Sequence, residues 1–321
     1  MSRLPDGPFT RDDLARCGVG RSVLDRFVAT GEVRKVLHHV YCRADVPDSV
    51  RLRAAAAALV LPAHVVVCDR SAAWLHGIDA FDPDEVGTVP PLEVVSYGGH
   101  DRVRREGTYA GKRALCDADI SVLEGGVLVT SPARTACDLA TLRGRRTALA
   151  VLDAFRRRFD LSEADLIRML PRFSGRRGVT QLRQLIPLST DLAESMPESW
   201  TRCVILDEGL PAPTPQVEVW VDGYGLVRLD LGYRGLKVAV EYDGEEHHSS
   251  AADRAADERR RAALRADGWI VIVVRRADLA HPASERWLTE LRDAIAERQR
   301  PHRRRHARGE QHPAYRRRRP A

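Results

Sequence analysis

Three carboxylates and a histidine are close together in the last third of the chain: Asp230, Glu241, Asp243 and His247. Glu241 and Asp243 are two positions apart, so on an extended strand their side chains leave the same face. A hairpin that turns at positions 234–235 would place Asp230 almost opposite Val240 and Glu241. Like charges packed beside a buried strand are unfavourable unless a cation neutralises them, so this pattern favours a divalent-metal site.

Oxygen ligands of this kind suit Mg²⁺, which is hard and keeps several waters for a phosphate substrate, and Mn²⁺ is the expected substitute. His247 and His248 follow Gly244 and could act as acid, base or water-orienting group. The alternative is that the acids are solvent-facing residues of an amphipathic hairpin. The spacing alone leaves both interpretations open.

Helices and strands of a definite order must position these residues. Periodicity and turn signals predict helices at 197–207, 251–267 and 282–298 and strands at 216–220, 225–233, 236–243 and 269–274. The expected order is α-β-β-β-α-β-α.

The same segment resembles a known family. Arg228-x-Asp230, the run 236–244 and His247 look like the core of the PD-(D/E)XK nucleases, closest to the branch similar to very short patch repair endonucleases. The resemblance continues through Asp257-x-x-Arg260, Leu264 and 268–271. Upstream, Ser195-x-Pro197-Glu198-Ser199 resembles the first helix of that family.

The resemblance implies that Asp230 and Glu241 hold Mg²⁺, that Glu198 supports the metal site, and that His247 assists the attacking water. Where the family usually has Lys, two residues after the acid, this chain has Asp243. The repair-like branch also lacks that Lys. Asp243 is therefore a candidate catalytic residue, and the proton-transfer role has no assigned residue.

The N-terminal segment predicts two short helices and a β-hairpin. Thr10 can cap a first helix that Gly18 ends, and Ser22 can cap a second that Gly31 ends, before a β-like run at 33–43. This is the layout of a winged helix-turn-helix, which binds DNA; the alternative is a helical hairpin that only packs on its neighbour. The candidate DNA-contacting residues here are Arg21, Arg26, Arg34 and Lys35.

The middle of the chain reads as a mixed α/β unit. Helices are expected at 51–61, from Ser71 to Gly77, from Ser131 and at 144–158, and strands at 64–68, 92–96 and 127–130. The long helix should face inward through Leu149, Leu152 and Phe155.

Short motifs in this half of the chain resemble AbiEi-type antitoxins. Phe9-x-Arg11, Gly18, Gly31 and Val40-Tyr41 are similar to their winged-helix module. Two further runs, Ser71-Ala72-Ala73 with Leu75-His76-Gly77 and Thr130-Ser131-Pro132-x-Arg134-Thr135-x-x-Asp138-Leu139, resemble the segment after it. His76 is interpreted as a packed helix-end histidine and Asp138 as a helix-face charge.

Charge and composition favour DNA as the partner. The net charge is +6, and positions 298–319 hold ten Arg against one Glu, among them the candidate DNA contacts Arg303, Arg304 and Arg305. This tail has almost nothing to bury and is expected to be disordered. The six scattered cysteines, the absence of a signal-peptide layout and the lack of a long apolar run predict a reduced, cytoplasmic protein without a membrane span.

The sequence therefore predicts an α+β multidomain protein: a winged helix-turn-helix at 1–48, an AbiEi-like α/β domain at 49–175, a restriction-endonuclease-like domain at 190–299 and a basic tail at 300–321. The first hypothesis is a Mg²⁺-dependent endonuclease with an N-terminal DNA-binding module. The alternative is an antitoxin-like DNA-binding repressor with an inactive nuclease fold, and a third is a scaffold whose tail binds polyanions. A second copy of the chain or a toxin-like protein is a further expected partner.

Overall fold

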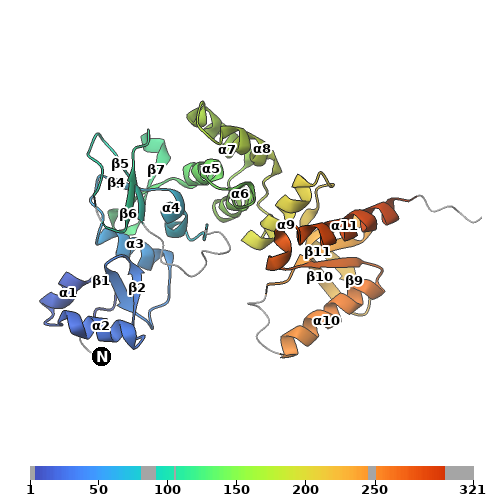
Figure 1. Cartoon of the computed structure of the whole chain (residues 1–321), viewed down its shortest axis with the longest axis horizontal. Helices are drawn as coiled ribbons and strands as arrows, with labels where there is room; N and C mark the ends of the chain where they lie inside the picture. The colour runs from blue at the N-terminus through green and yellow to red at the C-terminus, as the bar shows by residue number, and fades with distance from the viewer. Residues whose placement is uncertain (1–3, 81–91, 105, 245–250, 301–321) are drawn as a thin grey trace, which may run out of the picture.

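The computed structural model describes residues 4–80, 92–104, 106–244 and 251–300 of a mixed α+β protein with three small sheets. We divide it into an N-terminal unit (4–48), a middle unit (49–188) and a C-terminal unit (189–300), which follow one another across Figure 1. His247, His248 and the predicted tail contacts Arg303, Arg304 and Arg305 lie outside the described residues.

The N-terminal unit consists of two helices and a three-stranded sheet of order β1-β3-β2. Its elements are β1 (Phe9–Thr10), α1 (Arg11–Arg16), α2 (Arg21–Ala29), β2 (Val33–Leu37) and β3 (Val40–Arg43). Thr10 caps α1 in a capping box with Asp13, as predicted. Ser22 does not cap α2: the helix already begins at Arg21, because the Gly20 carbonyl accepts the first helical hydrogen bond, from the amide of Leu24.

The middle unit combines a five-stranded sheet of order β6-β5-β4-β8-β7 with six α-helices among its described residues. The strands are β4 (Val65–Val67), β5 (Leu92–Ser96), β6 (Thr108–Gly111), β7 (Ile120–Val122) and β8 (Leu128–Thr130). The helices are α3 (Val50–Ala58), α4 (Asp69–Leu75), α5 (Pro132–Leu142), α6 (Arg145–Phe159), α7 (Glu163–Met169) and α8 (Val179–Leu185). Helices α7 and α8 were not predicted from the sequence.

Helices α5 and α6 carry the main core of the middle unit. Leu149, Leu152 and Phe155 are fully buried, as predicted. Leu182 and Leu185 of α8 belong to the same core. The packed helices therefore continue beyond residue 175, the end of this domain predicted from the sequence.

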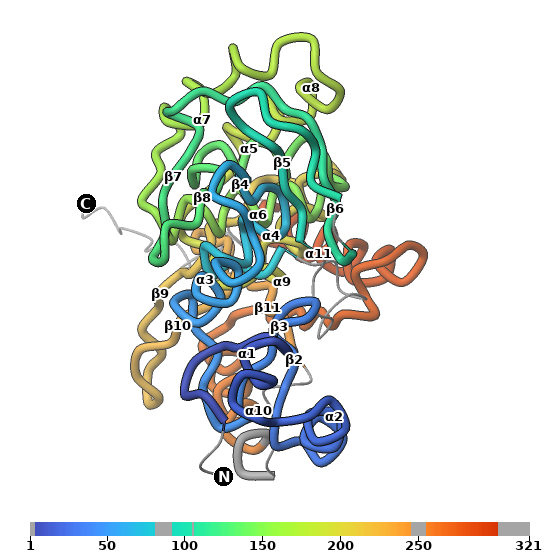
Figure 2. Tube along the Cα trace, turned by 90° about the vertical axis from the view of Figure 1, so that its left-hand side faces the viewer, coloured from blue at the N-terminus to red at the C-terminus, as the bar shows by residue number. Residues whose placement is uncertain are grey.

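The C-terminal unit has the predicted order α-β-β-β-α-β-α and a four-stranded sheet, β12-β11-β10-β9. Its elements are α9 (Met196–Asp207), β9 (Thr214–Val221), β10 (Gly225–Tyr233), β11 (Val238–Tyr242), α10 (Ala251–Ala266), β12 (Ile270–Val274) and α11 (Ser284–Gln299). Among the described strands of this sheet, only β11 and β12 run parallel, and α10 lies in the crossover between them. Helices α9 and α11 cover one face of the sheet and α10 the other (Figures 1 and 2).

The C-terminal unit is fastened to the middle unit through α6 and α9. Asp153 of α6 is almost fully buried and accepts hydrogen bonds from Arg202 at 2.6 Å and Ser199 at 2.7 Å, both on α9. Its other oxygen accepts from the backbone N–H of Thr190 at 2.8 Å. In the part of the chain that the structure describes, no helix has the length and apolar character needed to cross a bilayer.

Candidate functional site

The sheet of the C-terminal unit places Asp230 beside Glu241. Leu231 of β10 pairs with Val240 of β11, so the preceding residue, Asp230, stands opposite Glu241, as the sequence predicts. On the other side, Leu229 and Leu231 pair with Val217 and Pro215 of β9, which leaves Gln216 next to Asp230. A glutamine and two acids thus form one row across three strands.

Glu198 approaches this row from the first turn of α9, as the resemblance implies. The Ser195 hydroxyl donates to its Oε1 at 2.8 Å, and Gln216 Nε2 donates to its Oε2 at 2.7 Å. Gln216 has a φ of +52°, a left-handed conformation that costs a non-glycine residue energy. Backbone strain is thus retained where the Gln216 amide reaches Glu198.

Asp230 has a raised pKa in this cluster. Burial, followed by the negative charges of Glu198 and Glu241, raises the pKa of Asp230 to about 7, although the N–H of Tyr242 donates to its Oδ2 at 2.9 Å and opposes the shift. A carboxyl group that titrates near neutrality inside an acid cluster is a typical candidate for function.

Arginines that the sequence did not predict at this site neutralise Glu241 and Asp243. Arg260 of α10 donates to both oxygens of Glu241, at 2.6 and 2.9 Å. Arg261 lies 3.6 Å from Glu241 and 3.4 Å from Asp243, and Arg275 lies 3.6 Å from Asp243. The positive charge expected from a metal is supplied in this arrangement by the protein itself. The Asp257-x-x-Arg260 motif was the only sequence signal of this contact.

In this arrangement Glu198, Asp230 and Glu241 do not fit Mg²⁺. Both oxygens of Glu241 are engaged by Arg260, and both oxygens of Glu198 accept hydrogen bonds from Ser195 and Gln216. Among the described residues, Glu198, Asp230 and Glu241 are not a group whose ligand atoms all lie within 4.8 Å of one another. Mg²⁺ demands near-ideal octahedral geometry, so these side chains would have to rearrange first.

The predicted DNA contacts of the N-terminal unit differ in their availability. Arg21 and Arg26 are exposed on α2, and Lys35 is exposed on β2. Arg34 is half-buried and donates to the carbonyl of Val46 at 3.0 Å, so it acts inside the unit. Residues 4–48 carry seven basic and seven acidic side chains, so this unit supplies no net positive charge.

The motif residues of the middle unit are structural. His76 is buried, and its Nε2 lies 2.8 Å from the carbonyl oxygen of Thr130, in agreement with a packed helix-end histidine. Asp138 is not the helix-face charge that was expected. It is buried, and its carboxylate accepts hydrogen bonds from Arg134, one turn earlier on α5, at 2.7 Å and from Arg113, in the loop after β6, at 2.9 Å. Arg134 also binds Asp119 at 3.0 Å.

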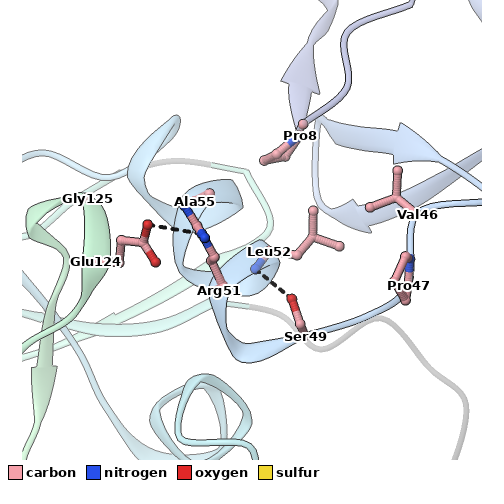
Figure 3. Close-up of a pocket in the computed structure, with 10 residues that line it drawn as sticks. Pro8, Val46, Pro47, Ser49, Arg51, Leu52, Ala55, Glu124 and Gly125 are labelled. Atoms are coloured by element: carbon pink, nitrogen blue, oxygen red, sulfur yellow. Dashed lines mark hydrogen bonds and ion pairs between the residues drawn. The ribbon is translucent and has the colours of Figure 1, made fainter.

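A mainly apolar cavity lies where the N-terminal unit meets α3 (Figure 3). Pro8 and Val46 approach it from the N-terminal unit, and Leu52 and Ala55 from α3. At its rim Arg51 forms an ion pair with Glu124 at 3.0 Å. The cavity contains none of the predicted site residues.

Comparison with known proteins identifies the middle unit. Residues 65–188 match the family described as AbiEi antitoxin C-terminal domain, so this unit is an antitoxin-type domain. Over 258 residues the chain is 31% identical to the uncharacterized protein Rv2248 of Mycobacterium tuberculosis strain H37Rv and to the uncharacterized protein MT2308 of strain CDC 1551. The alignment covers 79% of this chain and 89% of each relative. The chain belongs to the same family as these mycobacterial proteins.

Proposed function

We propose that this protein is a DNA-binding regulator of the antitoxin type. Its N-terminal unit would bind duplex DNA as a winged helix-turn-helix, and its C-terminal unit would be an inactive restriction-endonuclease-like domain that serves as a binding platform. One observation carries the proposal: two short helices and a β-hairpin precede the antitoxin-type segment 65–188, separated from it by α3. In helix-turn-helix proteins the second helix enters the major groove, and here it exposes Arg21 and Arg26.

The lack of catalysis rests on Glu241 and Asp243. Glu241 is neutralised by Arg260 and is almost fully buried, so a divalent cation would have to displace that arginine before binding. Asp243 is turned toward Arg261 and Arg275, which lie 3.4 and 3.6 Å from its carboxylate. The antitoxin-type domain further supports DNA, a second copy of the chain or a toxin-like protein as partners.

Fluorescence anisotropy with a labelled duplex from upstream of the gene, and a shuffled duplex for comparison, tests the DNA-binding function. Arg21→Ala and Arg26→Ala should each weaken binding by about tenfold, because each removes a charged contact to DNA. The matched control is Arg16→Ala, whose side chain is 74% exposed on the neighbouring helix α1. Equal losses in all three variants, or none, would contradict recognition by α2.

The second candidate is the Mg²⁺- or Mn²⁺-dependent endonuclease, favoured by the position of Asp230 between Glu198 and Glu241. Supercoiled plasmid and single-stranded DNA should be incubated with Mg²⁺, with Mn²⁺ and with EDTA. A regulator leaves both substrates intact. Divalent-dependent cleavage that disappears in folded Asp230→Ala and Glu241→Ala variants would replace the regulator by the nuclease.

A further inference from the structure

Two histidines and a glutamate meet where the N-terminal hairpin touches the middle unit. His38 and His39 form the turn between β2 and β3, and Glu106 precedes β6. The Nε2 atoms of the two histidines lie 3.6 and 3.8 Å from the two carboxylate oxygens of Glu106. One ligand atom from each residue lies within 4.8 Å of the other two.

The backbone holds this group in place. His39 has a φ of +65°, a conformation usually left to Gly or Asn, and the residues on either side of the two histidines, Leu37 and Val40, are fully buried. Gly107 lets the loop approach: a Cβ atom added there would lie 2.6 Å from His38 Cβ. The histidines therefore project from a fixed hairpin end against a closely apposed loop.

The buried ring nitrogen of His38 indicates that a ligand binds here. Its Nε2 atom is buried and has no hydrogen-bond partner among the described residues, and the Glu106 oxygen at 3.6 Å is beyond hydrogen-bond distance. Buried polar atoms nearly always have a partner, and those without one need an explanation such as an ion. A cation between Nε2 and the Glu106 carboxylate would satisfy both.

We propose that His38, His39 and Glu106 bind one Zn²⁺ or a similar transition-metal ion such as Co²⁺ or Ni²⁺. Two imidazoles and one carboxylate are ligands that suit these ions, whereas Mg²⁺ and Ca²⁺ prefer oxygen ligands only. With three protein ligands, a tetrahedral ion keeps one position for water or a group from a partner. The ion joins the tip of the hairpin to the middle unit.

Lys35 opposes the ion. Its Nζ lies 3.5 Å from His38 Nδ1 and can donate to it, which requires the proton of the neutral ring to sit on Nε2. A metal at Nε2 requires the opposite tautomer and also repels the ammonium group. Removal of the Lys35 charge should therefore strengthen metal binding.

Metal-free full-length protein should be titrated with Zn²⁺ by calorimetry and with Co²⁺ by visible absorption. One ion per chain should depend on this group: His38→Ala and Glu106→Gln weaken its binding by about tenfold or more, and Lys35→Gln strengthens it. His39→Gly removes a ligand while it relaxes the turn, so weaker binding there cannot result from misfolding.

His100→Ala is the matched control. His100 is exposed and stacks on His64 with ring centroids 4.2 Å apart, but the pair belongs to no three-ligand group among the described residues. This variant should bind Zn²⁺ and Co²⁺ as the wild type does. The proposal is overturned if His38→Ala, His39→Gly and Glu106→Gln bind the same number of ions with the same Kd as the wild type.

Discussion

Nη1 and Nη2 of Arg260 lie 2.6 and 2.9 Å from the two carboxylate oxygens of Glu241. The pair joins the crossover helix α10 to the central strand β11, and the Glu241 side chain is 3% exposed. A buried ion pair contributes little net stability when intact, but loss of one partner leaves an uncompensated buried charge.

Arg260→Met should therefore destabilise the protein by about 3 kcal/mol, measured by urea unfolding. The double variant Arg260→Met/Glu241→Gln should recover most of this loss, because no charge is then left unpaired. Arg265→Met is the control on the same helix: it breaks a surface pair with Glu258 and should change the free energy of unfolding by less than about 1 kcal/mol. Equal effects of Arg260→Met and Arg265→Met on the free energy of unfolding would show that Arg260 does not compensate the buried charge of Glu241.

The pH dependence of stability should report Asp230. Its pKa is about 7 in the folded protein, mainly because of burial, against about 3.9 in an unfolded chain. Between these values the folded state holds the proton more tightly, so the favourable contribution present below pH 4 is lost as the pH rises through 7. The loss is at most about 4 kcal/mol, from about 1.4 kcal/mol per pKa unit.

Asp230→Asn mimics the protonated acid and should remove this dependence. Relative to the wild type, the variant should gain stability in urea unfolding from pH 4 to about pH 7, and the difference should level off toward pH 8. Asp222→Asn, in the exposed turn between β9 and β10, should follow the wild-type curve at every pH. A constant difference between Asp230→Asn and the wild type would mean that Asp230 is already ionised at pH 4.

Gly178 should be essential to the antitoxin-type domain. It has a φ of +82°, and an added Cβ would lie 2.2 Å from the carbonyl oxygen of Thr141 in α5. Gly178→Ala should cost about 3 kcal/mol or more, since strain at positive φ adds to a clash with backbone that cannot move aside. Gly209 has a φ of +68° but open space around it, so Gly209→Ala should cost only about 1 kcal/mol. Similar midpoints for the two variants in urea unfolding would mean that α5 yields to the methyl group.

The sequence predicted elements best where an apolar pattern ends at turn residues. The bounds of β5 and β10 agree with their predicted ranges. The turn predicted at 234–235 placed Asp230 opposite Val240 and Glu241, and the observed register makes Glu241 its neighbour. A local pattern contains this information because hairpin register follows from the turn and the buried face.

Tertiary contacts determine the features of the site that were not predicted from the sequence. Arg260 reaches Glu241 only because α10 crosses back over the sheet, and the buried Asp138 carboxylate is bound by Arg113 from the loop after β6 as well as by Arg134 on its own helix. Gln216 takes a left-handed conformation inside a strand, which no propensity predicts. The prediction that Ser22 caps α2 was wrong for a local reason, because both Gly20 and Ser22 can begin a helix.

The arginine-rich tail should provide most of the salt dependence of DNA binding. The N-terminal unit has seven basic and seven acidic residues, so it has little net charge with which to release counterions from DNA. Residues 300–321 contain nine Arg and one Glu. Each phosphate contact makes the slope of log K against log salt concentration more negative by about 0.9. Truncation after Gln299 should therefore make that slope shallower by several units.

Phosphate contacts carry no sequence information, so the truncated protein should lose affinity equally for the upstream duplex and the shuffled duplex. Anisotropy titrations of both duplexes at about 50 to 200 mM salt measure the slope and the preference together. The complementary control is Arg26→Ala in the full-length chain, which should reduce the preference for the upstream duplex and change the slope by about one unit at most. A truncated protein with an unchanged slope, or with a different preferred duplex, would show that the tail is not a sequence-independent electrostatic contact.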